Sequence, residues 1–227
     1  MKCVVLCAGK GTRMESDIPK VLIPINGKPL VQHVIDMWNI VDEFIFVVGY
    51  RWKEVVKYLS KDSKYIIQKE QRGIADAILK VEGLVNDKFI VALGDCIQKG
   101  TWQIPLEESL QFGVGVWKTT NISEVNKNYL VKVSDKKLIT KVIEKPKLTY
   151  AVWDALCGMG TYFFDKRIFD YIRKTPKSSL RNEIEITDTI QLMINSRERV
   201  SPFFFIGRYL NITYPEDIKE AEELLNE

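Results

Sequence analysis

The sequence predicts an α/β fold with a mixed, mainly parallel sheet flanked by helices and a small antiparallel hairpin region. Two observations support this prediction. Over about the first hundred residues, short apolar segments alternate with segments of helical spacing, which is typical of parallel strands with helices on both faces of the sheet. Further along, two segments of alternating apolar and polar residues flank a polar turn, which indicates a hairpin.

The individual elements follow from the same patterns. The first strand is expected at 3–7, because this short apolar run contains two β-branched valines. Further strands are expected at 44–48, 65–67, 89–93 and 113–118, and the hairpin at 129–133 and 138–143. Helices are expected at 29–39, 52–59, 73–85, 166–174 and 216–225, and one more through Ile194 with Thr187 or Asp188 as its cap.

The composition limits the class of protein. A length of 227 residues allows one large domain or two small ones, and 46% hydrophobic residues suffice for a sizeable core. The net charge of +3 is near balance, so nucleic-acid binding is not indicated. No apolar run approaches the ~20 residues of a membrane helix, and no signal-peptide pattern is present, so a cytoplasmic location without a membrane partner is expected.

The four cysteines form no Cys-x-x-Cys pair and stand in apolar surroundings, so we expect them to be reduced and mostly buried. A zinc site is not indicated, because His33 is the only histidine.

A glycine-rich loop follows the first strand and reads Gly-Lys-Gly-Thr at 9–12. Glycines at a strand exit let backbone N–H groups approach a ligand closely. Arg13 and Lys20 add two cations, and this combination suits a triphosphate. A dinucleotide fingerprint fails at Met14 and a Walker A loop fails at Gly11, whereas an ordinary glycine turn remains the structural alternative.

Three motifs at set spacing extend this loop: Leu-x-Ala-Gly-x-Gly-Thr-Arg-Met at 6–14, Pro-Lys-Val-Leu at 19–22 and Gly-Lys-Pro-Leu at 27–30. Together they resemble the signature of the sugar-1-phosphate nucleotidyltransferases, the NDP-sugar pyrophosphorylases. Residues 31–36 resemble the uridylyltransferase domain of N-acetylglucosamine-1-phosphate uridylyltransferases. The resemblance implies a nucleotide-diphospho-sugar transferase fold with a Rossmann-like sheet. It also implies one domain over 1–227, in which 1–110 mainly bind nucleotide and 111–227 mainly bind the sugar phosphate.

The resemblance implies a nucleotide site made by the loop and by a Gln-x-x-x-x-Gly pattern at 68–73. An amide offers one donor and one acceptor, which suits the N3–H and O4 of uracil or thymine, so UTP and dTTP are not separated. A polar strand end followed by a helix start is the plain alternative. The residues expected to bind nucleotide are Leu6, Cys7 (where the family usually has Ala), Ala8, Gly9, Gly11, Thr12, Arg13, Lys20, Gln68, Gly73 and Ile74.

Asp95 ends the turn after the strand at 89–93, and Asn211 stands where the family has its second metal ligand. A divalent cation on phosphates prefers carboxylate and carbonyl oxygens together with water. The resemblance therefore implies Mg²⁺ on Asp95 and Asn211, although an aspartate here could also be a turn residue. Arg13, Lys20 and Asp95 are the residues expected to be catalytic.

The Glu-Lys-Pro motif at 144–146 matches the family's acceptor site. Glu144 would accept bonds from sugar hydroxyls and Lys145 would neutralise the sugar phosphate, whereas the alternative is an exposed charge pair. Two positions of the expected sugar-phosphate site depart from the family. Leu130 replaces a glycine that lies against the sugar, and Gly158 replaces an asparagine of the N-acetylglucosamine enzymes. The segment 180–188 also resembles the family and is expected to be scaffold.

The implied reaction is magnesium-dependent transfer of a nucleotidyl group from UTP or dTTP to a sugar-1-phosphate, with a glucose-1-phosphate-like hexose favoured. Pyrophosphate is released and an NDP-sugar is formed. The alternatives are an N-acetylglucosamine-1-phosphate uridylyltransferase, a cytidylyltransferase of a non-sugar phosphate, and a non-catalytic subunit that senses sugar nucleotides. A homo-oligomer is compatible with the resemblance. No hexapeptide repeat is present, so a β-helix acetyltransferase domain is not expected.

Overall fold

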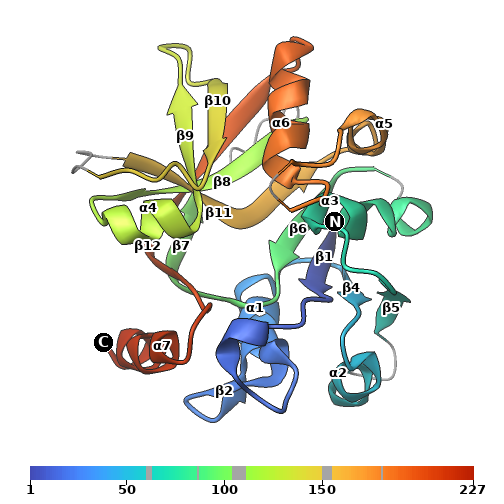
Figure 1. Cartoon of the computed structure of the whole chain (residues 1–227), viewed down its shortest axis with the longest axis vertical. Coiled ribbons are helices and arrows are strands. Elements are labelled where there is room, and N and C mark those ends of the chain that lie inside the picture. The colour runs from blue at the N-terminus through green and yellow to red at the C-terminus, as the bar shows by residue number, and fades with distance from the viewer. Residues whose placement is uncertain (60–62, 86, 104–110, 150–154, 180) are drawn as a thin grey trace.

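One ten-stranded sheet runs through the described part of the molecule, with helices packed on both of its faces (Figure 1). The computed structural model describes residues 1–59, 63–85, 87–103, 111–149, 155–179 and 181–227. The strand order is β5-β4-β1-β6-β11-β8-β12-β7, and β9 and β10 form a hairpin attached to β11. This mixed sheet, with its flanking helices and antiparallel hairpin, confirms the predicted fold class.

The parallel part of the sheet comes from the first hundred residues. Strands β5, β4, β1 and β6 lie side by side and run in the same direction. Their carboxyl ends therefore meet at one edge, where ligands bind in open sheets of this kind. Their bounds are β1 (Lys2–Cys7), β4 (Glu43–Val48), β5 (Lys64–Ile67) and β6 (Phe89–Leu93), which confirms the predicted strands with ends shifted by one residue at most.

The second half of the chain contributes mostly antiparallel pairs, although β12 runs parallel to β8. The hairpin β9–β10 lies where it was predicted, whereas the long pair β7–β12 was not predicted at all. The strands are β7 (Cys96–Gln103), β8 (Phe112–Thr119), β9 (Tyr129–Val133), β10 (Ile139–Glu144), β11 (Ala155–Phe164) and β12 (Val200–Asn211). A two-stranded ribbon joins β2 (Pro24–Ile25) to β3 (Lys28–Pro29).

The α-helices cover the sheet in two groups, with α1 and α2 on one face and α3, α5 and α6 on the other. Figure 1 shows the last helix, α7, beside the ribbon β2, where Asn26 and Asn226 are hydrogen-bonded at 3.1 Å. The helices are α1 (Leu30–Met37), α2 (Trp52–Tyr58), α3 (Ile74–Leu79), α4 (Ile122–Lys127), α5 (Ile168–Lys174), α6 (Ile186–Asn195) and α7 (Glu216–Asn226).

Two helix predictions were wrong in their bounds. The helix predicted at 73–85 ends at Leu79, and a 3-10 turn (Glu82–Leu84) follows. The predicted cap of α6 was also wrong, since the helix begins at Ile186 after the extended Glu185. The Thr187 hydroxyl does not cap the helix but donates to Glu144 Oε2 at 3.2 Å. In the segment 180–188, residue 180 lies outside the described residues.

Alternation along β1 separates the two core layers. Val4 and Leu6 face α3 and its neighbours, whereas Cys3, Val5 and Cys7 face α1 and α2. All four cysteines are free and buried, as predicted, and burial raises the pKa of each thiol.

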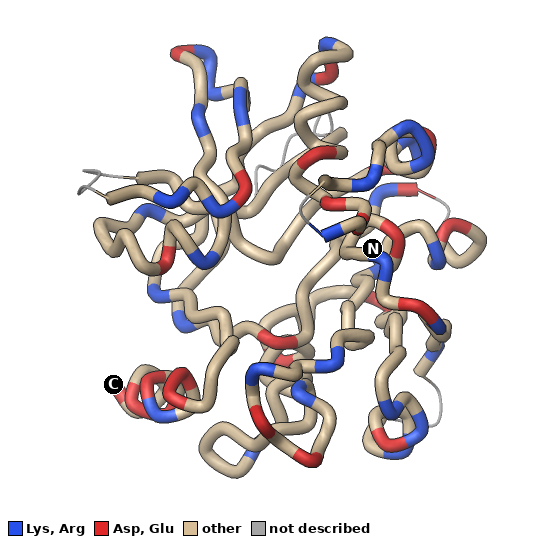
Figure 2. The backbone as a smooth tube through the Cα atoms, in the orientation of Figure 1, with Lys and Arg blue, Asp and Glu red and all other residues tan. Residues whose placement is uncertain are grey.

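Figure 2 shows acidic and basic residues interspersed over the molecule, in keeping with its nearly balanced charge. The helices of the described ranges all fall short of the length and apolar character that crossing a bilayer requires.

Candidate active site

Two connected cavities open at the carboxyl ends of the parallel strands. The first, of about 770 Å³, is lined by the glycine-rich loop and by Gln68 and Gly73, and we call it the loop lobe. The second, of about 820 Å³, is lined by Tyr129, Glu144 and residues of α4, and we call it the hairpin lobe. Residues common to both lobes mark where they join: Arg13, Lys20, Ile74, Leu93, Asp95, Lys145, Arg181 and Thr213.

The glycine-rich loop turns directly out of β1. Gly11 has a φ of +61°, and a Cβ there would lie 2.7 Å from the Cβ of Lys20. Only glycine therefore allows both the turn and the close approach of the Lys20 stem. Ten of the eleven residues predicted to bind nucleotide line the loop lobe. Cys7 is the exception, because strand alternation directs its side chain into the opposite core layer, where it is 2% exposed.

Gln68 ends β5 inside the loop lobe, and its amide has a fixed orientation. Its Nε2 donates to Asp76 Oδ2 at 2.8 Å and to the Gly73 carbonyl at 3.4 Å. A backbone carbonyl can only accept, so Gln68 must turn its Nε2 toward the Gly73 carbonyl and Asp76, and its Oε1 is an acceptor without a partner among the described residues. The sequence did not single out Asp76, which is 5% exposed in the first turn of α3.

Gly73 brings the segment after residue 180 against α3. It has a φ of +105°, and a Cβ there would lie 2.5 Å from the Ile184 carbonyl oxygen. The same carbonyl accepts from the Ala75 N–H at 3.3 Å. This contact explains why Arg181 and Glu183 line the loop lobe, although the sequence places them more than a hundred residues away.

Asp95 lies at the junction of the lobes and forms an ion pair with Lys20. Strand pairing sets Asn211 opposite Cys96, and the Ile212 N–H donates to the Asp95 carbonyl at 3.1 Å, so Asp95 and Asn211 are neighbours across the β7–β12 pair. The Asn211 Oδ1 is buried and has no hydrogen-bond partner in the described part of the chain.

The two side chains fit a divalent cation. One carboxylate and one unpaired amide oxygen are the donor types that such a cation takes. Within the described residues, no group of three or more His, Cys, Asp or Glu could hold a metal ion alone. A cation here would therefore take water for its remaining ligands, and phosphate oxygens in place of some of that water once a phosphate ligand is bound, as Mg²⁺ commonly does.

Glu144 and Lys145 line the hairpin lobe, as predicted, and are not an exposed charge pair. Glu144 Oε1 lies 4.0 Å from the Arg181 guanidinium. Burial raises the pKa of Glu144, against the opposing effect of Lys145 and Arg181. Burial, assisted by Arg181, lowers the pKa of Lys145. Lys145 also adopts a left-handed φ of +42°, a strained conformation of the kind found at functional sites.

Two predicted residues of the sugar-phosphate site do not line the hairpin lobe. Leu130 packs into the core, because alternation along β9 turns Tyr129 to the lobe instead. Gly158 is covered by the Tyr129 ring, whose hydroxyl donates to the Met159 carbonyl at 3.0 Å. Tyr129, Gly160 and Tyr162 line the lobe in their place.

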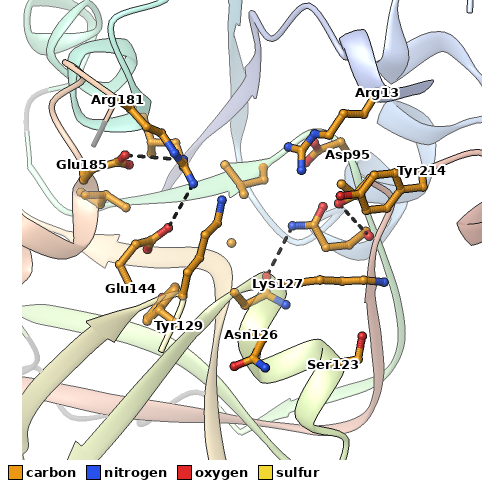
Figure 3. A pocket seen from close by; sticks show the side chains of 18 of the residues that line it. Arg13, Asp95, Ser123, Asn126, Lys127, Tyr129, Glu144, Arg181, Glu185 and Tyr214 are labelled. Atoms are coloured by element: carbon orange, nitrogen blue, oxygen red, sulfur yellow. Dashed lines mark hydrogen bonds and ion pairs between the residues drawn. The ribbon is translucent and has the colours of Figure 1, made fainter. Parts of the chain in front are cut away.

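The sequence missed several residues that line the hairpin lobe, and Figure 3 shows them around the cavity. Arg181, assigned to scaffold, points into it and lies 3.5 Å from Glu185. Lys127 lies 3.2 Å from Asp217 and so links α4 to α7. The Arg13 guanidinium lies 5.5 Å from the ring centre of Tyr214. No local motif marks these residues, because their segments lie far apart in the sequence and come together only in the folded chain.

The fold, with two adjoining cavities at the carboxyl ends of its parallel strands, is that of a nucleotidyltransferase. The chain belongs to the nucleotidyl transferase family, whose model matches residues 2–226. Within that family its relatives are sugar-1-phosphate nucleotidyltransferases, which confirms the resemblance found in the sequence.

Two curated relatives illustrate the match. The chain is 34% identical over 231 residues to the bifunctional protein GlmU of Methanocaldococcus jannaschii, which covers 99% of this chain and 54% of that protein. It is 32% identical over 242 residues to UTP–glucose-1-phosphate uridylyltransferase AglF of Haloferax volcanii, covering 100% and 97% of the two chains. The chain thus spans about half the length of that GlmU and nearly all of AglF.

Solved structures share the fold. A UDP-glucose pyrophosphorylase complexed with UDP-glucose matches with a TM-score of 0.86 at 24% identity, over 99% of this chain and 98% of that one. An inositol-1-phosphate CTP transferase from T. maritima matches with a TM-score of 0.78 at 22% identity, over 100% and 96% of the chains. At these identities the likeness shows the fold alone.

Proposed function

We propose that the chain transfers a nucleotidyl group from UTP or dTTP to a hexose-1-phosphate, with Mg²⁺, and releases pyrophosphate. The observation that carries this proposal is the ring of cations where the lobes join. Arg13 and Lys20 come from the loop side, and Lys145 and Arg181 from the other. Two phosphate-bearing ligands, one in each lobe, would meet at this point, where fixed cations offset their mutual repulsion.

In the proposed reaction, an oxygen of the sugar phosphate attacks the α-phosphorus of the nucleotide in line. The bond from that phosphorus to the bridging oxygen breaks, and pyrophosphate leaves without a covalent enzyme intermediate. Lys20, paired with Asp95 in the free protein, turns to the triphosphate together with Arg13. Lys145 guides the incoming phosphate and Glu144 holds the sugar hydroxyls. Asp95 and Asn211 would hold Mg²⁺, which supplies charge neutralisation for the phosphates when bound.

The fixed amide of Gln68 supports a uracil or thymine base. Because Asp76 occupies its Nε2, Gln68 offers an acceptor to the loop lobe. The N3–H of uracil or thymine can donate to that oxygen, whereas N3 of cytosine is itself an acceptor. This favours UTP or dTTP over CTP, and it argues against the cytidylyltransferase alternative.

Two observations support an unsubstituted hexose-1-phosphate as acceptor. The relative that matches over nearly its whole length is named as a UTP–glucose-1-phosphate uridylyltransferase. In addition, residue 158 is a glycine that the Tyr129 ring covers and that does not line the lobe, so this position offers no side chain to an N-acetyl group. The GlmU relatives keep N-acetylglucosamine-1-phosphate as the second candidate acceptor.

The division of the chain into nucleotide and sugar-phosphate parts also belongs to this proposal. Residues 1–110 would mainly hold the nucleotide and 111–227 the sugar phosphate. Arg181 crosses this division because it lines both lobes.

The test is pyrophosphate release measured over a grid of substrates. UTP, dTTP, CTP, ATP and GTP are each combined with glucose-, galactose-, mannose- and N-acetylglucosamine-1-phosphate, with Mg²⁺ and with EDTA as the control. We expect activity only with UTP or dTTP, only with a plain hexose phosphate, and only with the metal. Activity confined to N-acetylglucosamine-1-phosphate would overturn the acceptor assignment. Nucleotide binding without pyrophosphate release from any pair would indicate a non-catalytic sensing subunit.

A further inference from the structure

Asn128 follows the last residue of α4 and is buried beside Asn211. It is 8% exposed, and its side chain makes two hydrogen bonds. Its Nδ2 donates to the Glu124 carbonyl at 2.9 Å, and its Oδ1 accepts from Asn211 Nδ2 in a longer bond of 3.4 Å.

These bonds fix the orientation of both amides, one after the other. A backbone carbonyl can only accept, so Asn128 must present its Nδ2 to Glu124 and its Oδ1 to Asn211. That Oδ1 can also only accept, so Asn211 must present its Nδ2 to Asn128. The Asn211 Oδ1 is therefore the atom turned away from Asn128, and it is buried without a partner among the described residues.

We propose that Asn128 is a positioning residue that holds Asn211 with its carbonyl oxygen toward the cleft, where it can meet a divalent cation. The inference rests on the proposed function, because it takes Asn211 as a metal ligand. A reversed amide would present two N–H donors instead, which repel a cation. An aspartate at 211 would need no such help, since both of its oxygens accept.

The side chain of Asn128 can be tested apart from its backbone. The Asn128 carbonyl accepts from the Lys145 N–H at 3.0 Å, and this bond between backbone groups does not use the Asn128 side chain. Asn128→Leu keeps a similar size and removes only the amide. Asn121→Ala is the matched control, because Asn121 caps the other end of α4 through its bond to the Ser123 N–H at 2.9 Å. Its loss weakens the helix by about 1 kcal/mol and leaves the two bonded amides intact.

The experiment is a double-mutant cycle read by Mn²⁺ binding, with free Mn²⁺ measured by electron paramagnetic resonance and no substrate present. We expect Asn128→Leu to weaken Mn²⁺ binding about tenfold in the wild-type background, the lower end of the range for residues that orient a metal ligand. In the Asn211→Asp background the same change should alter the Mn²⁺ affinity by less than about twofold, which is the precision to which the effects of independent substitutions add. Asn121→Ala should leave the Mn²⁺ affinity unchanged.

Equal losses of Mn²⁺ affinity in both backgrounds would show that Asn128 supports the surrounding structure and does not act through the Asn211 amide. No loss of affinity in either background would show that Asn128 does not orient Asn211. An affinity that Asn211→Leu leaves unchanged would remove the metal from Asn211 and overturn the inference. The cycle is independent of the substrate grid. If no substrate pair releases pyrophosphate but the Mn²⁺ affinities change as expected, only the proposed reaction is rejected. If pyrophosphate is released but the substitutions at 128 do not change the Mn²⁺ affinity, only the role of Asn128 is rejected.

Discussion

The two lobes of the cleft are built in different ways. The loop lobe is made by chain turns at the ends of parallel strands, with the backbone of residues 8–12 close to any ligand. The hairpin lobe is made by side chains from β9, β10, β11, α4 and the segment after β12. Sequence motifs identified ten of eleven proposed residues of the first lobe, but only Glu144 and Lys145 among four in the second.

The difference follows from how each lobe is encoded. A turn that must let a backbone approach a ligand needs glycines at fixed spacing, which are visible in a short stretch of sequence. A wall of side chains needs only that distant segments come together, and many residue types can serve. A lobe of the first kind is therefore suited to an invariant group such as a triphosphate, and one of the second kind to a varied acceptor.

The largest effect should come from the junction of the lobes. Lys20→Ala should lower turnover about a hundredfold or more, because one fixed charge at a reacting phosphate is worth that much. Steady-state pyrophosphate release is the measurement. Lys28→Ala is the control, since Lys28 is an exposed lysine that lies 2.6 Å from Asp36 and outside both lobes. Turnover within a few-fold of wild type in Lys20→Ala would remove Lys20 from the reaction.

Arg181 tests whether the lobes are coupled. Arg181→Ala should lower kcat/KM for both substrates by about ten- to a hundredfold, the worth of a charged hydrogen bond, because Arg181 lines both cavities. Arg181→Lys, which keeps the charge, should restore part of each loss. A change confined to one substrate would assign Arg181 to a single lobe, and no change would return this segment to a purely structural role.

Glu144 sharpens the comparison, because its effect should stay within the hairpin lobe. Glu144→Ala should raise the KM of the sugar phosphate about tenfold, through the loss of a charge-assisted bond to the sugar. The KM of the nucleotide should stay within about twofold of wild type, since Glu144 does not line the loop lobe. Equal changes in both KM values would mean that the lobes cannot be separated in this way.

Gly158 offers a smaller perturbation of the same lobe. A Cβ at 158 would overlap the buried Tyr129 ring, and such overpacking costs about 1–3 kcal/mol. Gly158→Ala should therefore lower the melting temperature by several degrees and raise the acceptor KM a few-fold, with nucleotide binding unchanged. Gly83→Ala is the matched control, because a Cβ there meets nothing within 4 Å. Equal melting temperatures in the two variants would show that the Tyr129 ring moves freely.

The smallest effect concerns pH. Burial and Arg181 lower the pKa of Lys145, so its charge is lost at a pH below the ordinary lysine value of 10.5. Below that pKa, Lys145 is charged and attracts the sugar phosphate, and above it this attraction disappears. The kcat/KM of the sugar phosphate should therefore fall with rising pH before 10.5, and Lys145→Arg should move this fall upward. Identical profiles would show that another group titrates.

Much of the fold could be predicted, and the failures share one physical cause. Apolar runs such as 89–93 and the alternating hairpin carry their structure in local patterns. The pair β7–β12 could not be predicted, because these residues form strands through their pairing with neighbouring strands and not through a local sequence pattern. The motifs did not show that Cys7 and Leu130 would line neither lobe, because a motif gives the position of a residue but not which face of its strand it occupies. Asp76 and Asn128 act on other side chains, and no family motif marks such a role.

The four buried thiols have a practical consequence for observing the cleft at work. Only a thiolate reacts readily with maleimide dyes, and every native cysteine here is buried with a raised pKa. The native chain should therefore remain unlabelled at neutral pH, and a single cysteine introduced at an exposed site would carry the dye alone. One label on the exposed Ile40, which follows α1, and a second at the tip of the hairpin near Lys136 would report by energy transfer whether the distance between these two parts of the molecule changes when substrates bind.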